Sequence, residues 1–227
     1  MNEINTFDNA SRIQIFVGEF GSGKTELAIN YAICLAMQNR KTAIVDIDLV
    51  KPYFRTRESR KLLEKNGVIV VAPDQNLSHS DLPIMPRDLT RTLYDSECRV
   101  VIDAGGGDSA ISLGQINNQL IENSYEAILV VNTCRPFTSN ADDIVGVIQR
   151  IEKLSRLKIS KLVSNTNLAG ETTVEHILSG LNVLENVSSR LDLPIKWVVV
   201  PEWIKENISL NYPIFYLKPY TLYPWMD

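Results

Sequence analysis

Short apolar runs rich in β-branched residues alternate along the chain with longer stretches of helical periodicity. The expected strands are residues 12–17, 42–46, 68–71, 99–103, 126–131, 159–164 and 195–200. Several of these runs are continuously apolar, as strands covered on both faces should be. The expected helices are residues 24–39, 55–66, 86–97, 109–123, 139–156, 172–191 and 202–208. The alternation predicts an α/β fold, a doubly wound and mostly parallel sheet of seven to eight strands with helices on both faces.

The chain of 227 residues shows no repeat, low-complexity tract or linker, so we expect residues 1–227 to form one domain. Segment 73–87 is the longest stretch without a regular pattern, and it carries His79, Asp81 and Arg87. Loops of this length are often functional, although an ordinary surface excursion is an equal alternative. The last sixteen residues contain four tyrosines and three prolines, and the prolines exclude a continuous amphipathic helix there.

Composition narrows the class of protein. The formal net charge is −4 and 44% of the residues are hydrophobic, as in an ordinary globular protein. The acidic balance argues against a broad nucleic-acid-binding surface, so no nucleic-acid partner is expected. No apolar run is long enough for a membrane helix and the polar N-terminus is unlike a secretory signal, so we expect a cytoplasmic protein. Cys34, Cys98 and Cys134 form no CxxC or CxC pair, so no iron–sulfur cluster is expected.

Residues 18–25 read G-E-F-G-S-G-K-T and match the phosphate-loop pattern GxxxxGK[ST]. The motif follows an expected strand and opens an expected helix, which is the context it requires. Its glycines let backbone N–H groups face one concavity, and the helix N-terminus adds partial positive charge. Lys24 is expected to contact the β- and γ-phosphates, and the Thr25 hydroxyl to bind Mg²⁺. The expected nucleotide-binding residues here are Gly18, Glu19, Gly21, Ser22, Gly23, Lys24, Thr25 and Glu26.

A dinucleotide-binding fingerprint is the alternative for the same glycines. The run G-S-G at 21–23 could begin GxGxxG, and Asp46 falls where a ribose-binding acid would stand. That motif needs a small residue at position 26, where this chain has Glu, and it gives Lys24 and Thr25 no role. The phosphate loop is therefore the stronger interpretation.

Acidic residues end two of the expected strands. Asp46 and Asp48 close the second strand, and Asp103 closes the fourth, ahead of three glycines that suit a moving loop. Doubly wound sheets bind ligands at this end of their strands, and carboxylates suit Mg²⁺. We expect Asp48 and Asp103 to act at the metal, and Asp48 to act in catalysis with Lys24 by orienting the attacking water. A helix cap or turn is the plain alternative for each acid, and Asp46 could take the place of Asp48.

Together these motifs resemble the deviant-Walker ATPase superfamily of MinD, ParA, ArsA and nitrogenase iron protein, also described as the CobQ/CobB/MinD/ParA nucleotide-binding domain. The separation of Lys24 and Asp48 matches that of MinD-like members, and "DAGGG" at 103–107 looks like the family's second switch. The segment at 132–151 resembles the one that follows the family's central strand. The likeness covers residues 12–218 and implies ATP and Mg²⁺ as cofactors.

The resemblance also implies residues that contact the base. In "LVSNTN" at 162–167, Asn165 matches the asparagine that reads the base, and in "VVVPEW" at 198–203, Pro201 and Glu202 match a segment that packs on it. A turn residue and a helix start are the plain alternatives for Asn165 and Pro201. ATP is expected over GTP because Asn165 lacks the following Lys-x-Asp of the guanine-specific pattern.

One departure from the family bears on mechanism. The family's signature lysine, which reaches across an ATP-sandwich dimer to the partner's phosphates, is replaced here by Glu19. A carboxylate repels phosphate, so a nucleotide-dependent homodimer is expected only without that lysine contact. Lys51, Arg55 or Arg57 could supply a replacement cation from the first switch, or could form an ordinary solvated face.

These observations support three functions. The leading expectation is a Mg²⁺-dependent ATP-binding protein, an ATPase that acts as a nucleotide-driven switch on a protein partner. The second is an ATP-dependent synthetase or kinase of a small carboxylate, like dethiobiotin- or cobyrinate-type synthetases, with segment 73–87 supplying the substrate pocket. The third is a module that binds nucleotide with negligible hydrolysis, which the acid at position 19 favours.

Overall fold

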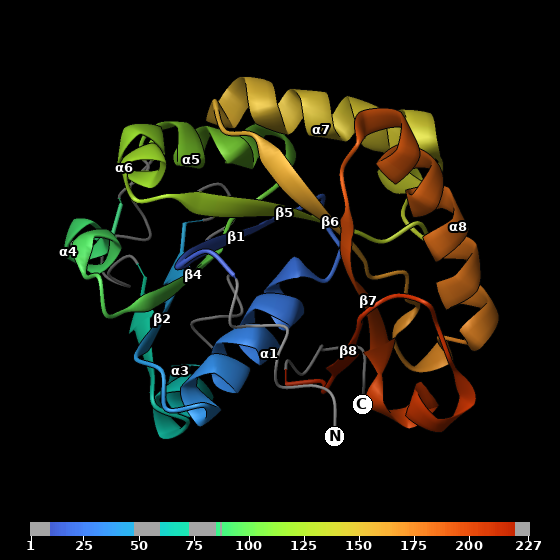
Figure 1. Cartoon of the computed structure of the whole chain (residues 1–227), viewed down its shortest axis with the longest axis horizontal. Coiled ribbons are helices and arrows are strands. Elements are labelled where there is room, and N and C mark those ends of the chain that lie inside the picture. Colours follow the sequence, from blue (N-terminus) through green and yellow to red (C-terminus); the bar gives the residue numbers. More distant parts are fainter. Residues whose placement is uncertain (1–9, 48–59, 73–84, 87, 221–227) are drawn as a thin grey trace.

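The computed structural model describes residues 10–47, 60–72, 85–86 and 88–220 of the chain. Eight parallel strands form one sheet in the order β3-β2-β4-β1-β5-β6-β7-β8 (Figure 1). The strands are β1 Ile13–Val17, β2 Thr42–Asp46, β3 Val68–Val71, β4 Arg99–Asp103, β5 Tyr125–Val131, β6 Ile159–Ser164, β7 Ile195–Pro201 and β8 Ile214–Leu217. The predicted doubly wound α/β fold is confirmed, and its sheet is entirely parallel.

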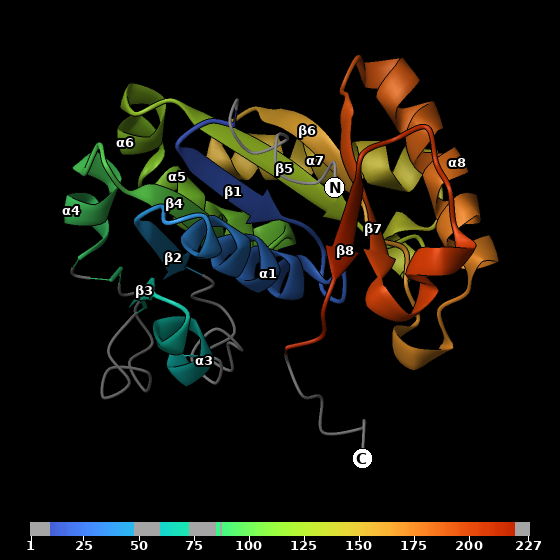
Figure 2. The ribbon, with the colours of Figure 1, turned by 60° about the horizontal axis from the view of Figure 1, so that its bottom comes forward.

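The helices lie on both faces of this sheet. They are α1 Lys24–Met37, α3 Arg60–Lys65, α4 Leu89–Tyr94, α5 Ile111–Gly114, α6 Asn117–Glu122, α7 Ala141–Ser155 and α8 Val174–Leu191. Figure 2 shows α1 in front of the sheet and α7 behind it. Apolar side chains of α1 and α3 pack in one core cluster, and those of α5, α7 and α8 pack in the other. The sheet is thus buried on both sides, which explains the continuously apolar strands.

Three expected helices differ from the structure. The stretch 109–123 is divided into the 3₁₀ turn η2 Gly107–Ala110, then α5 and α6. It breaks at Gly114 because the backbone there lies against α7, where an added Cβ would stand 2.8 Å from the Leu154 carbonyl oxygen. The expected helix 202–208 is the 3₁₀ helix η5 Glu202–Asn207. The expected helix 86–97 is confined to α4, since Asp95 leaves the helical region at ψ 101°.

Strand β8 was not among the expected strands, although the predicted strand number allowed for it. Its four residues lie between Pro213 and Pro219, and they pair in parallel with the end of β7. Prolines are tolerated beside a short edge strand because no further strand needs their N–H groups. The composition of the tail therefore concealed a strand rather than ruling out regular structure.

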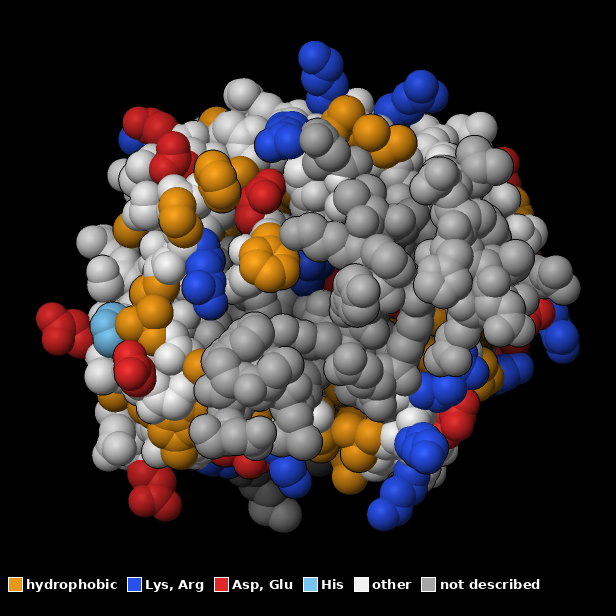
Figure 3. All heavy atoms as spheres, turned by 180° about the vertical axis from the view of Figure 1, so that it is seen from behind, with side chains coloured by type: hydrophobic (Ala, Val, Ile, Leu, Met, Phe, Trp, Pro, Cys, Tyr) orange, Lys and Arg blue, Asp and Glu red, His pale blue; other side chains and the backbone are white. Residues whose placement is uncertain are grey.

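Charged and hydrophobic side chains are mixed on the surface of the molecule. In the view from behind, Lys and Arg side chains are interspersed with Asp and Glu, and hydrophobic side chains lie among them (Figure 3). Within the described residues, no helix has the length and apolarity needed to cross a bilayer.

Candidate nucleotide-binding site

The phosphate loop, residues 18–23, connects the carboxyl end of β1 to the first residue of α1. Gly21 and Gly23 both have φ of +79°, a left-handed conformation that strains any residue with a Cβ. The Leu27 N–H already donates to the Gly23 carbonyl at 3.1 Å, so α1 begins directly after the loop. The first N–H groups of a helix have no acceptor within the helix, and its dipole favours an anion there. Lys24, buried, and Thr25, half-buried, occupy this first turn.

Three side chains from the ends of β5 and β6 hold the carbonyl groups of the loop. Asn132 Nδ2 and Arg135 Nε each donate to the Gly21 carbonyl at 3.2 Å. Asn165 Nδ2 donates to the Ser22 carbonyl at 2.6 Å. The loop conformation is thus fixed by contacts to its carbonyl groups, which leaves the N–H groups of the following helical turn for a ligand.

Asn132 connects the phosphate loop with the segment after β6. The residue is fully buried, and besides donating to Gly21 it donates to the Asn167 carbonyl at 3.0 Å. Its Oδ1 accepts from the N–H groups of Cys134 at 3.0 Å and Asn167 at 3.2 Å. Every hydrogen-bonding position of the side-chain amide is therefore used. Sequence reasoning quoted the segment that contains Asn132 and Arg135 but gave neither residue a role.

Two buried carboxylates stand beside the loop. Asp46 on β2 and Asp103 on β4 are paired in register, and Asp103 is also paired with Phe16 of β1. Both acids are at most 1% exposed. Neighbouring strands are about 4.8 Å apart, so the two carboxylates share one edge of the sheet with the phosphate loop. Oxygen donors of this kind suit Mg²⁺. The structure thus brings Asp103 to the predicted place, while Asp48 lies outside the described residues.

Glu19 is turned toward the glycines after β4. Its Oε1 is buried and has no hydrogen-bond partner among the described residues. That oxygen and the guanidinium carbon of Arg150 each lie 3.5 Å from the position that a Cβ on Gly107 would take, so they are at most 7 Å apart. Gly106 packs directly on the loop, since its added Cβ would stand 2.9 Å from the Glu19 nitrogen. The acid therefore faces the predicted second switch and α7.

The other predicted contacts are spread around this edge. Glu26 is buried, and its Oε1 accepts from the Tyr220 N–H at 2.6 Å, so it fastens the C-terminal segment to α1. Asn165 is buried against the loop. Pro201 is the buried last residue of β7, and Glu202 is exposed at the start of η5. Contacts of these four residues with a nucleotide stay predictions.

The three cysteines form no disulfide with one another, and burial raises the pKa of Cys98 and of Cys134. Among the described residues, His, Cys, Asp and Glu form no group of three or more arranged to hold a metal ion. A metal at this edge would accordingly depend on the strand-end carboxylates together with the Thr25 hydroxyl and the ligand's own oxygens.

Comparison with known proteins identifies the fold of the chain but does not identify its family. No protein-family model and no curated protein matches the sequence. The structure is similar to FtsY from Mycoplasma mycoides, with 17% identity, a TM-score of 0.55, and coverage of 85% of this chain and 60% of that one. It is similar to the signal recognition particle 54 kDa protein from Aeropyrum pernix K1 in complex with GDP, with 19% identity, a TM-score of 0.56, and coverage of 84% and 42%.

FlhF complexed with GTP and Mg²⁺ is a third similar structure, with 16% identity, a TM-score of 0.53, and coverage of 82% of this chain and 64% of that one. The chain thus spans less than two thirds of the length of each of these three proteins. Identities this low establish the shared fold alone. The chain has the α/β fold of P-loop nucleoside triphosphatases, and its narrower assignment to the MinD/ParA group stays a prediction.

Proposed function

We propose that the carboxyl edge of the sheet binds a nucleoside triphosphate with Mg²⁺, and that the protein is an NTPase acting as a nucleotide-driven switch on a protein partner. The observation that carries the proposal is the phosphate loop itself. Its two left-handed glycines are held from outside by Asn132, Arg135 and Asn165, directly before a helix N-terminus. Such a concavity, rich in N–H groups, is complementary to phosphate.

Each residue at this edge has a role in the proposal. Lys24 binds the β- and γ-phosphates, and the Thr25 hydroxyl and Asp103 hold Mg²⁺ directly or through water. The metal would neutralise phosphate charge when bound. Asp48 orients the attacking water. The glycines at 105–107 lie against the loop and are suited to respond to the γ-phosphate, because Gly106 touches the backbone of Gly18.

The identity of the base is the finer part of the proposal. We propose ATP, because Asn165 is not followed by the guanine-specific Lys-x-Asp. Two of the similar structures were solved with GDP and with GTP and Mg²⁺, which makes guanine the alternative to be tested. Calorimetric titration with MgATP and with MgGTP distinguishes the two nucleotides, because a protein contact specific to one base strengthens the binding of that nucleotide alone.

Lys24→Ala is the matching test of the site. We expect it to weaken binding of the preferred nucleotide about 100-fold or more, because a charge-assisted contact to two phosphates is lost. The control is Lys153→Ala, an exposed lysine on α7, which should bind like the wild type. A Lys24→Ala protein with wild-type affinity, or a wild type that binds neither nucleotide, would refute the proposal.

The rate of hydrolysis tests the switch. Turnover that rises when a co-purifying protein is added supports it. Turnover that requires a small carboxylate would instead identify a synthetase or kinase, and tight binding with negligible turnover under both conditions would identify a binding module. The oligomeric state with and without nucleotide tests the expected homodimer in the same samples.

A further inference from the structure

The described part of the site has several carboxylates and few cations. Glu19, Asp46 and Asp103 stand around the loop, and Lys24 is the cation of the motif itself. The Arg150 guanidinium lies near the Glu19 carboxylate, on the side of Gly107. P-loop sites stabilise the charge of a triphosphate with further cations, arginines among them. With a glutamate at position 19, a second cation has to come from elsewhere in the chain or from a partner.

Arg135 places a guanidinium group directly on the phosphate loop. Its Nε donates to the Gly21 carbonyl at 3.2 Å. A Cβ added to Gly21 would stand 2.8 Å from that Nε and 3.3 Å from the guanidinium carbon, so the group lies flat against the glycine. The residue is nevertheless exposed, so its guanidinium is accessible from solvent.

The backbone around Arg135 is fixed on both sides. Its N–H donates to the Asn132 carbonyl at 3.2 Å, and its carbonyl accepts from the Thr138 N–H at 3.1 Å at the start of the 3₁₀ turn η3 Pro136–Thr138. Asn132 is itself anchored by four side-chain hydrogen bonds. The backbone that carries Arg135 is therefore anchored, and the Nε contact with Gly21 restricts its side chain further.

Arg135 keeps most of its hydrogen-bonding capacity. Within the described residues, Nε is engaged with the loop, while the two terminal nitrogens have no partner. Those two nitrogens form the planar fork that binds two phosphate oxygens at once. A residue that served only to support the loop would need no more than the Nε contact.

We propose that Arg135 binds the nucleotide phosphates and supplies, from the same chain, the second cation that Glu19 cannot provide. The inference rests on the proposed function and adds to it a residue that neither the loop motif nor the family resemblance indicated. It also assigns a different residue to the task that the sequence suggested for Lys51, Arg55 or Arg57, which lie outside the described residues.

The test compares Arg135→Gln with Arg135→Lys in the full chain, by calorimetric titration with MgATP or MgGTP, whichever the wild type binds more tightly. Glutamine keeps a donor for the Gly21 carbonyl but has no charge, and lysine keeps the charge but has no fork. We expect Arg135→Gln to weaken binding about tenfold or more, and Arg135→Lys to restore part of that loss. Lys153→Gln, an exposed lysine on α7, is the control and should stay within about twofold of the wild type.

Thermal unfolding without nucleotide accompanies each titration, and equal melting temperatures exclude a folding defect as the cause of weaker binding. The inference is overturned if Arg135→Gln binds within twofold of the wild type, or if Arg135→Lys binds no better than Arg135→Gln. In both cases the proposed function survives as long as Lys24→Ala weakens binding about 100-fold or more. A wild type that binds neither nucleotide overturns both proposals.

Discussion

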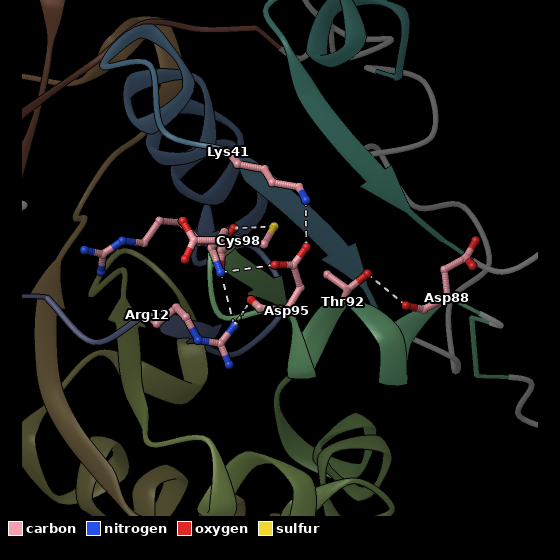
Figure 4. Close-up of polar contacts among 8 residues, drawn as sticks. Arg12, Lys41, Asp88, Thr92, Asp95 and Cys98 are labelled. Atoms are coloured by element: carbon pink, nitrogen blue, oxygen red, sulfur yellow. Dashed lines mark hydrogen bonds and ion pairs between the residues drawn. The ribbon is translucent and has the colours of Figure 1, made fainter.

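Polar groups are paired differently at the two ends of the parallel strands. We call the end at which the strands begin the amino edge, and the end at which they finish the carboxyl edge. At the amino edge, Arg12 donates to the carbonyl groups of Leu93, Asp95 and Cys98, and Lys41 pairs with Asp95 at 2.7 Å (Figure 4). At the carboxyl edge, the buried Glu19 Oε1 and Ser22 Oγ have no hydrogen-bond partner among the described residues, and neither does Gln119 Oε1 on α6, near the amino edge. Buried polar atoms are normally satisfied, so such exceptions ask for an explanation. The difference fits the proposed function, in which the amino edge stabilises the fold and the two unpaired groups of the phosphate loop lie at the ligand site.

A second cluster of polar side chains at the amino edge is also paired, and this cluster is largely buried. Glu126 on β5 forms an ion pair with Lys196 on β7 and accepts from Gln14 on β1 at 2.8 Å. Burial lowers the pKa of Lys196, although its hydrogen bond with Glu126 acts in the opposite direction. The charged form of Lys196 therefore depends on Glu126 for its stability. Variants at the amino edge should therefore change stability, and variants at the carboxyl edge should change binding.

The largest expected effect on stability is that of Lys196→Met, which leaves the largely but not fully buried Glu126 without its cation. We expect a loss of about 3–5 kcal/mol in the free energy of unfolding, measured by urea titration. Nucleotide affinity, measured under conditions where the variant is folded, should be unchanged. Lys153→Met, at an exposed position of α7, is the control. A loss below about 1 kcal/mol for Lys196→Met would show that the pair is not needed for the fold.

The next largest effect on stability is expected from a comparison of two glycines that lie inside helices. Gly180 on α8 is buried against the Thr166 side chain after β6, whereas an added Cβ at Gly146 on α7 would meet nothing within 4 Å. Gly180→Ala should cost about 1–3 kcal/mol by overpacking. Gly146→Ala should be neutral or should stabilise by up to about 1 kcal/mol, because alanine is the better helix former. Equal effects in urea titration would mean that α8 does not pack closely on this segment.

Two buried serines, Ser155 at the amino edge and Ser22 at the carboxyl edge, allow the same comparison with a smaller change of side chain. Ser155 Oγ donates to the Ile151 carbonyl at 2.7 Å and accepts from the Leu157 N–H at 3.2 Å. Ser155→Ala should therefore cost about 1–2 kcal/mol. Ser22→Ala removes a hydroxyl that has no partner in the described part of the chain. Without nucleotide it should change the stability by less than about 0.5 kcal/mol or increase it. A Ser22→Ala loss as large as that of Ser155→Ala would contradict the idea that this hydroxyl is left for a ligand.

The smallest effect concerns the exposed pair at the amino edge. The hydrogen bond from Lys41 lowers the pKa of Asp95, and the same contact raises the pKa of Lys41. The contribution of Asp95 is therefore present above its unfolded pKa of about 3.9 and is lost as the pH falls through the lower folded pKa. The contribution of Lys41 is present below about pH 10.4 and is lost as the pH rises through its higher folded pKa.

Lys41→Gln should accordingly be slightly less stable than the wild type at pH 7 in urea titration. The difference should shrink as the pH falls through the lowered pKa of Asp95 toward pH 2, because the carboxylate loses its charge. A difference that is the same at pH 2 and pH 7 would show that the ion pair is not its source.

Features encoded in short stretches of sequence were predictable. The apolar runs gave seven of the eight strands, and the glycines with Lys24 and Thr25 placed the loop between β1 and α1, where the structure has it. Asp103 was predicted at the same edge because a strand delivers its last residue there. These features depend on periodicity and spacing, which a single sequence displays.

Contacts between distant segments were not predictable. Asn132 and Arg135 reach a loop more than a hundred residues earlier in the chain, and their residue types would equally suit an ordinary turn. The contact of Glu26 with a nucleotide stays a prediction, but its hydrogen bond with the Tyr220 N–H, near the other end of the chain, could not be foreseen. The break at Gly114 likewise depends on α7 packing, which helical periodicity does not reveal.

Amide hydrogen exchange with and without MgATP or MgGTP tests the central claim most directly, because it reports both edges of the sheet in one experiment. The nucleotide-binding carboxyl edge predicts slower exchange in residues 18–27 and 103–107, and unchanged exchange in residues 93–99 at the amino edge. Exchange that is unaffected in 18–27 at saturating nucleotide, or slowed equally at both edges, would contradict it.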